Sequence, residues 1–120
     1  MTLEERQALN LRFLGHIVNI KIDRQIGSIH PKHVDIKYPI NYGYIEGVIG
    51  GDGEELDVYL LGVDKPVSEY TARIIAVIRR TDDDEDKLVA APDGMLFTKD
   101  EIRSITHFQE QFHTSEIDLL

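Results

Sequence analysis

The spacing of apolar residues predicts a helix near each end of the chain. Thr2 and Glu5 form a capping box, Gly15 is a good C-cap, and the apolar stripe between them comprises Leu3, Ala8, Leu11 and Leu14. Thr98 and Glu101 form a second capping box, followed at helical spacing by Ile102, Ile105, Phe108 and Phe112. We expect the two phenylalanines to anchor the second helix in the core.

Between the helices the hydrophobic pattern takes a period of two, which predicts strands. Residues 16–22 place Val18, Ile20 and Ile22 on one face, and residues 56–61 alternate in the same way. Residues 72–80 and 88–91 are the most apolar segments. Short strands about ten residues apart, with a helix at either end, indicate a small β-barrel with helices packed outside it, within the all-β or α+β class.

The segments between the strands are rich in turn residues. Residues 23–37 form a polar loop that is long for so small a protein, and such loops are often functional. Residues 36–45 are interrupted by Pro39 and Gly43, so we expect them to lie at a sheet edge or to bend sharply. Residues 47–53 contain four glycines and predict a mobile or tightly turning connection.

Length and charge narrow the class of protein. At 120 residues, one domain covering residues 1–120 is expected. The net charge of −9 argues against a nucleic-acid or anionic-membrane partner, which would need a basic face, and is compatible with cation binding. There is no cysteine, and no N-terminal apolar run resembles a signal peptide, so a cytoplasmic protein is expected.

Residues 52–57 form the first acidic cluster, Asp-Gly-Glu-Glu-Leu-Asp, between the glycine-rich loop and a strand. Mg²⁺ prefers oxygen ligands and needs only one or two protein carboxylates, so acids converging here could hold a metal ion. A solvated acidic turn would produce the same pattern.

Residues 82–87 form the second cluster, Asp-Asp-Asp-Glu-Asp-Lys, between two apolar strands. Five consecutive acids repel one another, and a counterion would relieve that repulsion. A plain polar hairpin loop is the alternative. A calcium loop is a weak match, because its sixth position is Lys87 instead of glycine.

Three motifs in order carry a resemblance to a known family. Residues 38–45 read Tyr-Pro-Ile-Asn-Tyr-Gly-Tyr-Ile, the cluster at 52–57 follows, and the second cluster ends in Lys-Leu-Val at 87–89. In this order they resemble the soluble family I inorganic pyrophosphatases, over roughly residues 16–113. The resemblance implies a small OB-like β-barrel and Mg²⁺-dependent hydrolysis of inorganic diphosphate, with Mn²⁺ as a second possible metal.

The resemblance also implies roles for the acidic residues. Asp52 and Asp57 match aspartates that bind the activating metal ions, and Glu54 matches the residue credited with activating the attacking water. Catalysis would therefore rest on Glu54 and Asp57. In the second cluster Asp82 matches a metal ligand, and a further ligand falls on either Glu85 or Asp86.

Phosphate contacts would come from Lys32, Tyr42, Lys87 and His113, again by resemblance. His113 stands where the family has a lysine, and Phe112 where it has a tyrosine. The family also inserts a hairpin, carrying a phosphate-binding arginine, before its Tyr-Pro motif. Here the interval from Lys32 to the motif is too short for it, so either Lys37 or no residue replaces that arginine.

These departures leave the carboxylates in place but remove cations, so metal binding is a firmer expectation than fast turnover. His30 and His33 could line an anion pocket and replace some of the lost contacts, or could be plain loop residues. Diphosphate hydrolysis is the leading hypothesis. One alternative is a catalytically silent metal- and phosphate-binding module, regulatory or assembling with a partner, and another is an enzyme for a phosphorylated metabolite or nucleotide. A homo-oligomer is also possible.

Overall fold

Two helices and six strands make up residues 2–120, the part of the chain that the structure, a computed structural model, describes. In chain order they are α1 (Leu3–Leu11), β1 (Ile17–Arg24), β2 (Asn41–Ile49), β3 (Glu55–Leu60), β4 (Glu69–Arg80), β5 (Lys87–Ala91), α2 (Lys99–Glu110) and β6 (Ser115–Leu119).

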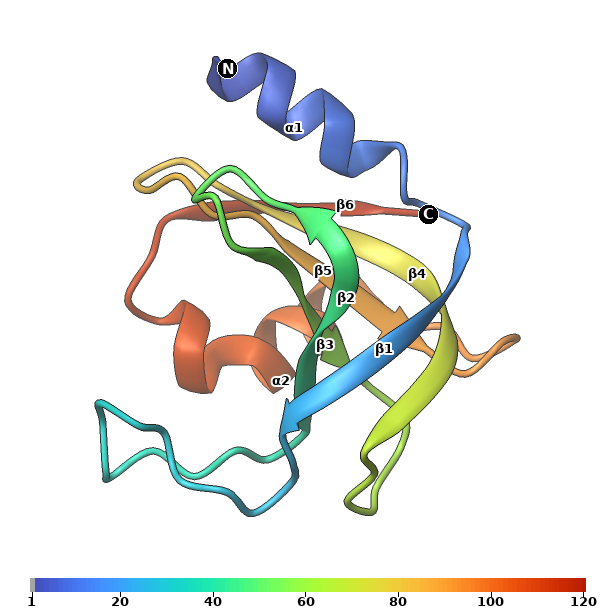
Figure 1. The fold of residues 1–120 in the computed structure, drawn as a ribbon, viewed down its shortest axis with the longest axis vertical. Coiled ribbons are helices and arrows are strands. Elements are labelled where there is room, and N and C mark those ends of the chain that lie inside the picture. The colour runs from blue at the N-terminus through green and yellow to red at the C-terminus, as the bar shows by residue number, and fades with distance from the viewer. Residues whose placement is uncertain (1) are drawn as a thin grey trace.

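The first five strands close into a barrel (Figure 1). They pair in the order β1-β2-β3-β5-β4, and β4 pairs back onto β1 to complete the ring. The β3–β5 pair is parallel and the other pairs are antiparallel. Strand β6 adds to the outer edge of β4, where Ile78 lies opposite Ile117. The predicted small barrel with helices outside is confirmed.

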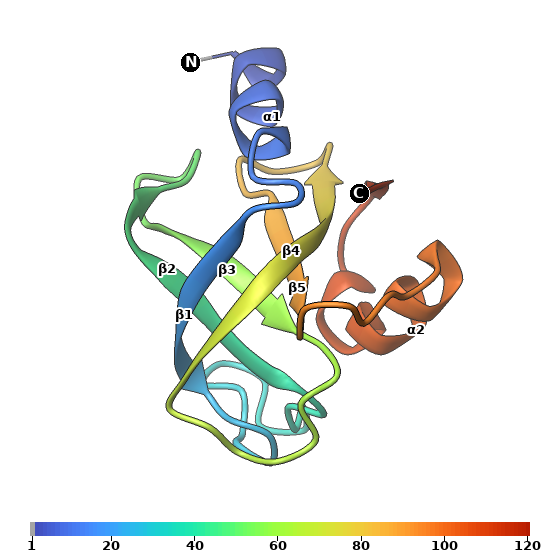
Figure 2. The same cartoon turned by 90° about the vertical axis from the view of Figure 1, so that its right-hand side faces the viewer.

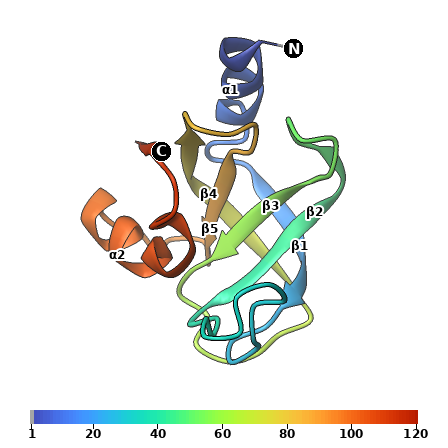
Figure 3. The same ribbon diagram turned by 90° about the vertical axis from the view of Figure 1, so that its left-hand side faces the viewer.

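The helices and the long loop occupy different sides of the barrel. Figure 2 shows α1 across one end, the loop of residues 25–40 at the opposite end, and α2 against the side formed by β5. Figure 3 shows the same arrangement from the other side, with β2 and β3 in front. Within residues 2–120 neither helix has the length and apolar character needed to cross a membrane.

The core has two layers because β3 and β5 are buried on both faces. Leu56, Val58 and Leu60 of β3 point into the barrel, as their alternation predicts. Tyr59 points the other way, into a second cluster that includes Val89 and residues of α2 such as Ile102. Helix α2 thus covers the outer face of these strands and excludes water from it.

Strand β2 contradicts the expectation of an edge segment. It pairs with β1 on one side and with β3 on the other, and Gly43 lies opposite Ile22 and Val58. A Cβ at Gly43 would stand 1.8 Å from the carbonyl oxygen of Lys21, so any side chain would force the strands apart. Gly43 therefore permits close strand approach where it was interpreted as a break.

The helix ends differ from the predictions in two places. Helix α1 ends at Leu11 with Arg12 as its C-cap, and Gly15 adopts its positive φ of 85° in the following turn. Its buried residues are Arg6 and Asn10 instead of leucines. Phe112 lies beyond the end of α2 and is 56% exposed, so it is not a core anchor.

Candidate functional site

A cavity of about 600 Å³ lies beside the barrel and gathers six of the predicted site residues. The loop after β1, the loop between β4 and β5, and the end of α2 surround it, all on the left of Figure 1. The six residues are Lys32, Tyr42, Asp57, Glu85, Lys87 and His113. Acidic and basic side chains therefore face the same space.

Lys87 lies at the centre of this charge arrangement. Its Nζ donates to Asp57 Oδ2 at 2.7 Å and to a carboxylate oxygen of Glu85, and its side chain is only 3% exposed. It also lies over the ring of Tyr42, 5.6 Å from the centroid. Burial alone would lower the pKa of Lys87, but Tyr42, Asp57 and Glu85 outweigh burial and raise it. Lys87 is therefore a fixed positive charge.

Glu85 and Asp52 form a carboxyl pair next to Lys87. Burial would raise the pKa of Glu85, but Lys87, with smaller contributions from Asp52 and Arg80, lowers it to about 2. The pKa of Asp52 moves upward, because of burial first and then its hydrogen bond with Glu85. Asp52 shares a small adjoining space with Asp57 and Glu85. Three acidic residues from two segments therefore border this space.

Arg80 is a cavity residue that the sequence interpretation missed. It is the last residue of β4 and is 4% exposed. Its Nε and Nη2 donate to the two carboxylate oxygens of Glu110 at 3.0 and 2.6 Å, and its Nη1 donates to Asp83 at 3.1 Å. The available signal was a basic residue between an apolar strand and the acidic run.

Glu110 connects Arg80 to a chain of buried hydroxyl and amide groups. The hydroxyl of Tyr59 donates to Glu110 Oε2 at 2.6 Å, and Gln109 Nε2 donates to that hydroxyl at 2.8 Å. Tyr38 in turn donates to Gln109 Oε1 at 3.2 Å. Burial and the adjacent Glu110 carboxylate raise the pKa of Tyr59, so its hydroxyl remains a donor. This network fixes the end of α2 against the cavity.

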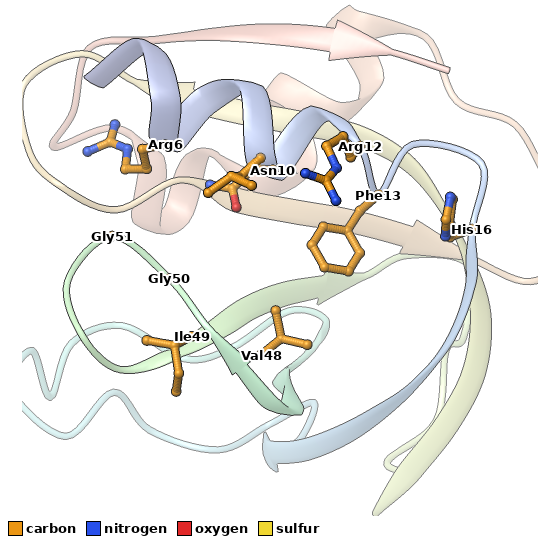
Figure 4. A pocket seen from close by; sticks show the side chains of 10 residues that line it. Arg6, Asn10, Arg12, Phe13, His16, Val48, Ile49, Gly50 and Gly51 are labelled. Atoms are coloured by element: carbon orange, nitrogen blue, oxygen red, sulfur yellow. The ribbon is translucent and has the colours of Figure 1, made fainter. Parts of the chain in front are cut away.

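Four predicted residues do not line this cavity, namely Asp52, Glu54, Asp82 and Asp86. Glu54 is exposed in the turn before β3, where its backbone N–H donates to Asp52 Oδ1 at 3.0 Å. The side chain of Asp86 is fully buried and accepts from Arg6 and Asn10 of α1, both at 2.9 Å. Figure 4 labels those two partners on α1. Of the two alternatives, the structure brings Glu85 to the cavity and not Asp86.

Asp82 lies at the rim of the cavity. It is exposed in the β4–β5 loop, and its Oδ1 is 3.4 Å from His113 Nδ1. It also lines a separate depression with Arg6 and Asp83. Of the predicted acids, Asp52, Asp57 and Glu85 therefore lie near Lys87 and Asp82 lies at the rim, whereas Glu54 and Asp86 lie apart from both.

The end of β1 and the loop that follows it contribute a second set of basic groups. Arg24 and Lys32 line the cavity, and Asp23 is beside them. The ring of His33 stacks on Phe112 with centroids 5.5 Å apart, which holds the loop against the end of α2. Lys37 is not among the residues that line the cavity, whereas Arg24 and Arg80 are.

His30 shapes this loop through its ring nitrogen. Its Nδ1 accepts backbone N–H groups from Lys32 at 3.1 Å and from His33 at 3.2 Å, so this nitrogen is unprotonated. Burial lowers the pKa of His30 below its usual 6.5, and the neighbouring charges of His33, Arg24 and Lys32 lower it further.

We expect the pKa of His30, followed by NMR of the imidazole, to lie below 6.5 in the folded protein. Because folding favours the neutral ring, its stabilising contribution is present above pH 6.5 and is lost as the pH falls below that value. The His30→Asn variant, which keeps an acceptor but does not titrate, should lose less stability than the wild type between pH 7 and pH 5. A pKa at or above 6.5 would contradict this prediction.

A second pocket, of about 310 Å³, lies between α1 and the end of β2 (Figure 4). Phe13 and Val48 form its apolar floor, and Arg12 and His16 lie along its edge. None of the predicted site residues lines it. Its contribution to the site is indirect, because Arg6 on its wall also donates to the carbonyl oxygens of Arg80 and Asp83.

The structure defines a class of protein: a small closed barrel with a side cavity lined by paired acidic and basic side chains. Comparison with known proteins identifies the group within this class. The family model for inorganic pyrophosphatase matches residues 15–118. The chain belongs to the inorganic pyrophosphatase family.

Individual relatives and solved structures agree with this assignment. An inorganic pyrophosphatase of Corynebacterium glutamicum is 30% identical over 105 residues, covering 82% of this chain and 65% of that protein. The Ehrlichia chaffeensis inorganic pyrophosphatase structure has a TM-score of 0.67 at 22% identity, covering 88% of this chain and 87% of that one. One from Neisseria gonorrhoeae has a TM-score of 0.60 at 25% identity, with coverage of 88% and 80%.

The match to curated relatives is partial in length. It covers 65% of the Corynebacterium protein and 56% of an inorganic pyrophosphatase of Streptomyces coelicolor. The family and the OB-like barrel are therefore established, whereas the activity of this chain has to be argued from its own residues.

Proposed function

We propose that this protein hydrolyses inorganic diphosphate to two phosphate ions with the help of Mg²⁺. The observation that carries the proposal is the position of Lys87, which lies within hydrogen-bond distance of both Asp57 and Glu85 in a cavity that also contains Lys32 and Arg80. A charged substrate and a charged cofactor can be neutralised together in such a site.

Asp52, Asp57 and Glu85 are the residues that would hold the metal. They fit an oxygen-preferring divalent cation, because their carboxylates border the same small space and a cation there would relieve the repulsion between them. Mg²⁺ or Mn²⁺ would supply charge neutralisation and a more acidic bound water. We favour Glu85 over Asp86 as the ligand, since both oxygens of Asp86 are bound by α1.

The basic side chains would bind and orient the substrate. Lys32, Lys87 and Arg80 line the cavity and can neutralise the phosphate oxygens, and Tyr42 adds a hydroxyl close to Lys87. His113 at the rim is a further predicted phosphate contact. Arg80 is held in one orientation by Glu110 and Asp83, so its guanidinium is fixed at the cavity wall.

In the reaction, the oxygen of water bonds to one phosphorus while the bridging P–O bond breaks, and the second phosphate leaves. Of the predicted catalytic pair, Asp57 is the residue that lines the cavity. We therefore assign to Asp57 the role of accepting the proton of the attacking water. Glu54 was predicted for this role but is exposed outside the cavity. Lys87 and Arg80 stabilise the charge that develops on the phosphate groups.

A nucleotide or phosphorylated metabolite is the second candidate substrate, because the cavity of about 600 Å³ is larger than a diphosphate ion requires. Phosphorus NMR of a mixture of diphosphate, a nucleoside triphosphate and a sugar nucleotide, with Mg²⁺, separates the two. We expect the diphosphate resonance to be replaced by orthophosphate while the others persist. Cleavage of an organic phosphoanhydride with diphosphate intact would instead identify the second candidate.

Location and assembly remain predictions. A cytoplasmic setting is consistent with the absence of cysteine, and the charge of −9 is consistent with no nucleic-acid or membrane partner. A homo-oligomer is proposed from the family resemblance. Sedimentation of the purified protein tests the last point.

A further inference from the structure

Asp82, Asp83 and His113 form a compact cluster at the rim of the cavity, separate from the carboxylates around Lys87. One ligand atom from each side chain lies within 4.8 Å of the other two. His113 Nδ1 is 3.4 Å from Asp82 Oδ1 and 3.3 Å from Asp83 Oδ2. An imidazole nitrogen and two carboxylates therefore converge on one point from two different segments.

The imidazole nitrogen in this cluster lacks a hydrogen-bond partner. His113 Nδ1 is shielded from solvent, and no group in residues 2–120 is placed to hydrogen-bond with it, although two carboxylates are close. A buried ring nitrogen without a partner is costly. An ion bound between the three side chains would satisfy that nitrogen and both acids at once.

The distances between His113 Nδ1 and the two carboxylate oxygens fit three ligands around a metal ion better than they fit direct hydrogen bonds. With metal–ligand distances of about 2.0–2.2 Å, neighbouring ligands of a tetrahedral site are separated by roughly 3.3–3.6 Å. The two distances from His113 Nδ1 fall in this range. A direct N–H···O hydrogen bond would be shorter, typically about 2.9 Å.

The cluster is also held in place by its surroundings. The backbone N–H of Thr81 donates to the carbonyl of Thr114 at 2.9 Å, which joins the acidic loop to the segment that carries His113. Arg80 Nη1 donates to Asp83 Oδ2 at 3.1 Å, and the backbone N–H of Glu85 donates to Asp83 Oδ1 at 2.9 Å. Outer hydrogen bonds of this kind orient ligating carboxylates.

We propose that Asp82, Asp83 and His113 bind a divalent transition metal, such as Mn²⁺, Co²⁺ or Zn²⁺, in preference to Mg²⁺. Imidazole nitrogen suits these ions, whereas Mg²⁺ selects oxygen ligands. His113 is then a metal ligand in place of the phosphate contact inferred from sequence. This proposal shares with the proposed function only its place at the same cavity. It is tested independently, because metal binding is measured without substrate.

The test is a Co²⁺ and Mg²⁺ titration of the metal-free protein, by calorimetry and by the visible absorption of bound Co²⁺. We expect Co²⁺ to bind at least about tenfold more tightly than Mg²⁺. His113→Gln should weaken the Co²⁺ affinity at least about tenfold and leave that for Mg²⁺ within about twofold. His107→Gln, an exposed histidine of α2 outside the cavity, should change neither affinity.

Two further measurements keep the test decisive. Melting curves of the metal-free variants verify that each is folded, and Asp82→Asn should lose Co²⁺ affinity as His113→Gln does. Equal Co²⁺ affinity in the wild type and in folded His113→Gln would overturn the proposal. A protein that binds Co²⁺ through His113 but does not cleave diphosphate would support this site and contradict the proposed function, so the two failures are distinguishable.

Discussion

Replacing Asp57 by asparagine is expected to lower the turnover of inorganic diphosphate by about 100- to 1,000-fold. Asp57 lines the cavity and accepts a hydrogen bond from Lys87 at 2.7 Å. The amide retains the size of the side chain but removes the charge that would bind a metal ion and accept a proton. Steady-state phosphate release with saturating Mg²⁺ measures the loss.

Asp64→Asn is the matched control for this substitution. Asp64 is exposed in the loop after β3 and lies outside the cavity, so its variant should retain wild-type turnover within about twofold. Circular dichroism should show both variants folded, because Glu85 still pairs with Lys87 when Asp57 is changed. Turnover by folded Asp57→Asn within tenfold of the wild type would remove Asp57 from the catalytic machinery.

Replacing Glu110 by alanine is expected to lower the free energy of unfolding by about 3–5 kcal/mol, or the melting temperature by roughly 10–20 °C. The variant leaves the guanidinium of Arg80 buried without the two hydrogen bonds at 3.0 and 2.6 Å. It also removes the acceptor of the Tyr59 hydroxyl. Urea unfolding at pH 7 measures the effect.

Two further variants determine whether the loss comes from removing the main counter-charge of Arg80. Glu46→Ala, an exposed glutamate of β2, should change the free energy of unfolding by less than about 0.5 kcal/mol. The double variant Arg80→Met with Glu110→Leu should recover much of the stability, since it replaces the buried pair with apolar groups. A double variant as unstable as Glu110→Ala would show that lost packing, and not the loss of the Glu110 counter-charge, causes the effect.

The strands of the barrel could be predicted from the sequence because their faces differ. Val58 and Leu60 enter the barrel interior while Tyr59 enters the layer under α2, and the period of two reports that division. The capping box of Thr98 and Glu101 also marked the start of α2 correctly, since both hydrogen bonds are local. Such features depend on short-range spacing alone.

Features that depend on distant segments were not predictable. From the sequence alone, Gly43 indicates a break in the strand. Its actual role depends on the carbonyl of Lys21, which lies beside it in the barrel. Strand β6 was missed because five residues near the chain end gain their pairing only from β4. The exposure of Phe112 follows from the end of α2 at Glu110, which spacing alone did not locate.

The candidate site shows the same division between local and distant information. Motif positions gave Asp57, Lys87 and Tyr42, which the structure places around one cavity. They could not distinguish Glu85 from Asp86, because the distinction depends on Arg6 and Asn10 of α1 occupying Asp86. Arg80 was not predicted for a similar reason, because its partner Glu110 is 30 residues away in the sequence.

The most direct measurement of the central claim is hydrolysis of inorganic diphosphate by the wild-type protein in ¹⁸O-labelled water with Mg²⁺. The account predicts two orthophosphates for each diphosphate consumed, one of them carrying a single ¹⁸O from the attacking water, and no reaction when the metal is chelated. Phosphate release equal to that of Asp57→Asn with both Mg²⁺ and Mn²⁺, from a folded protein that still binds phosphate, would contradict the claim and identify a binding module instead.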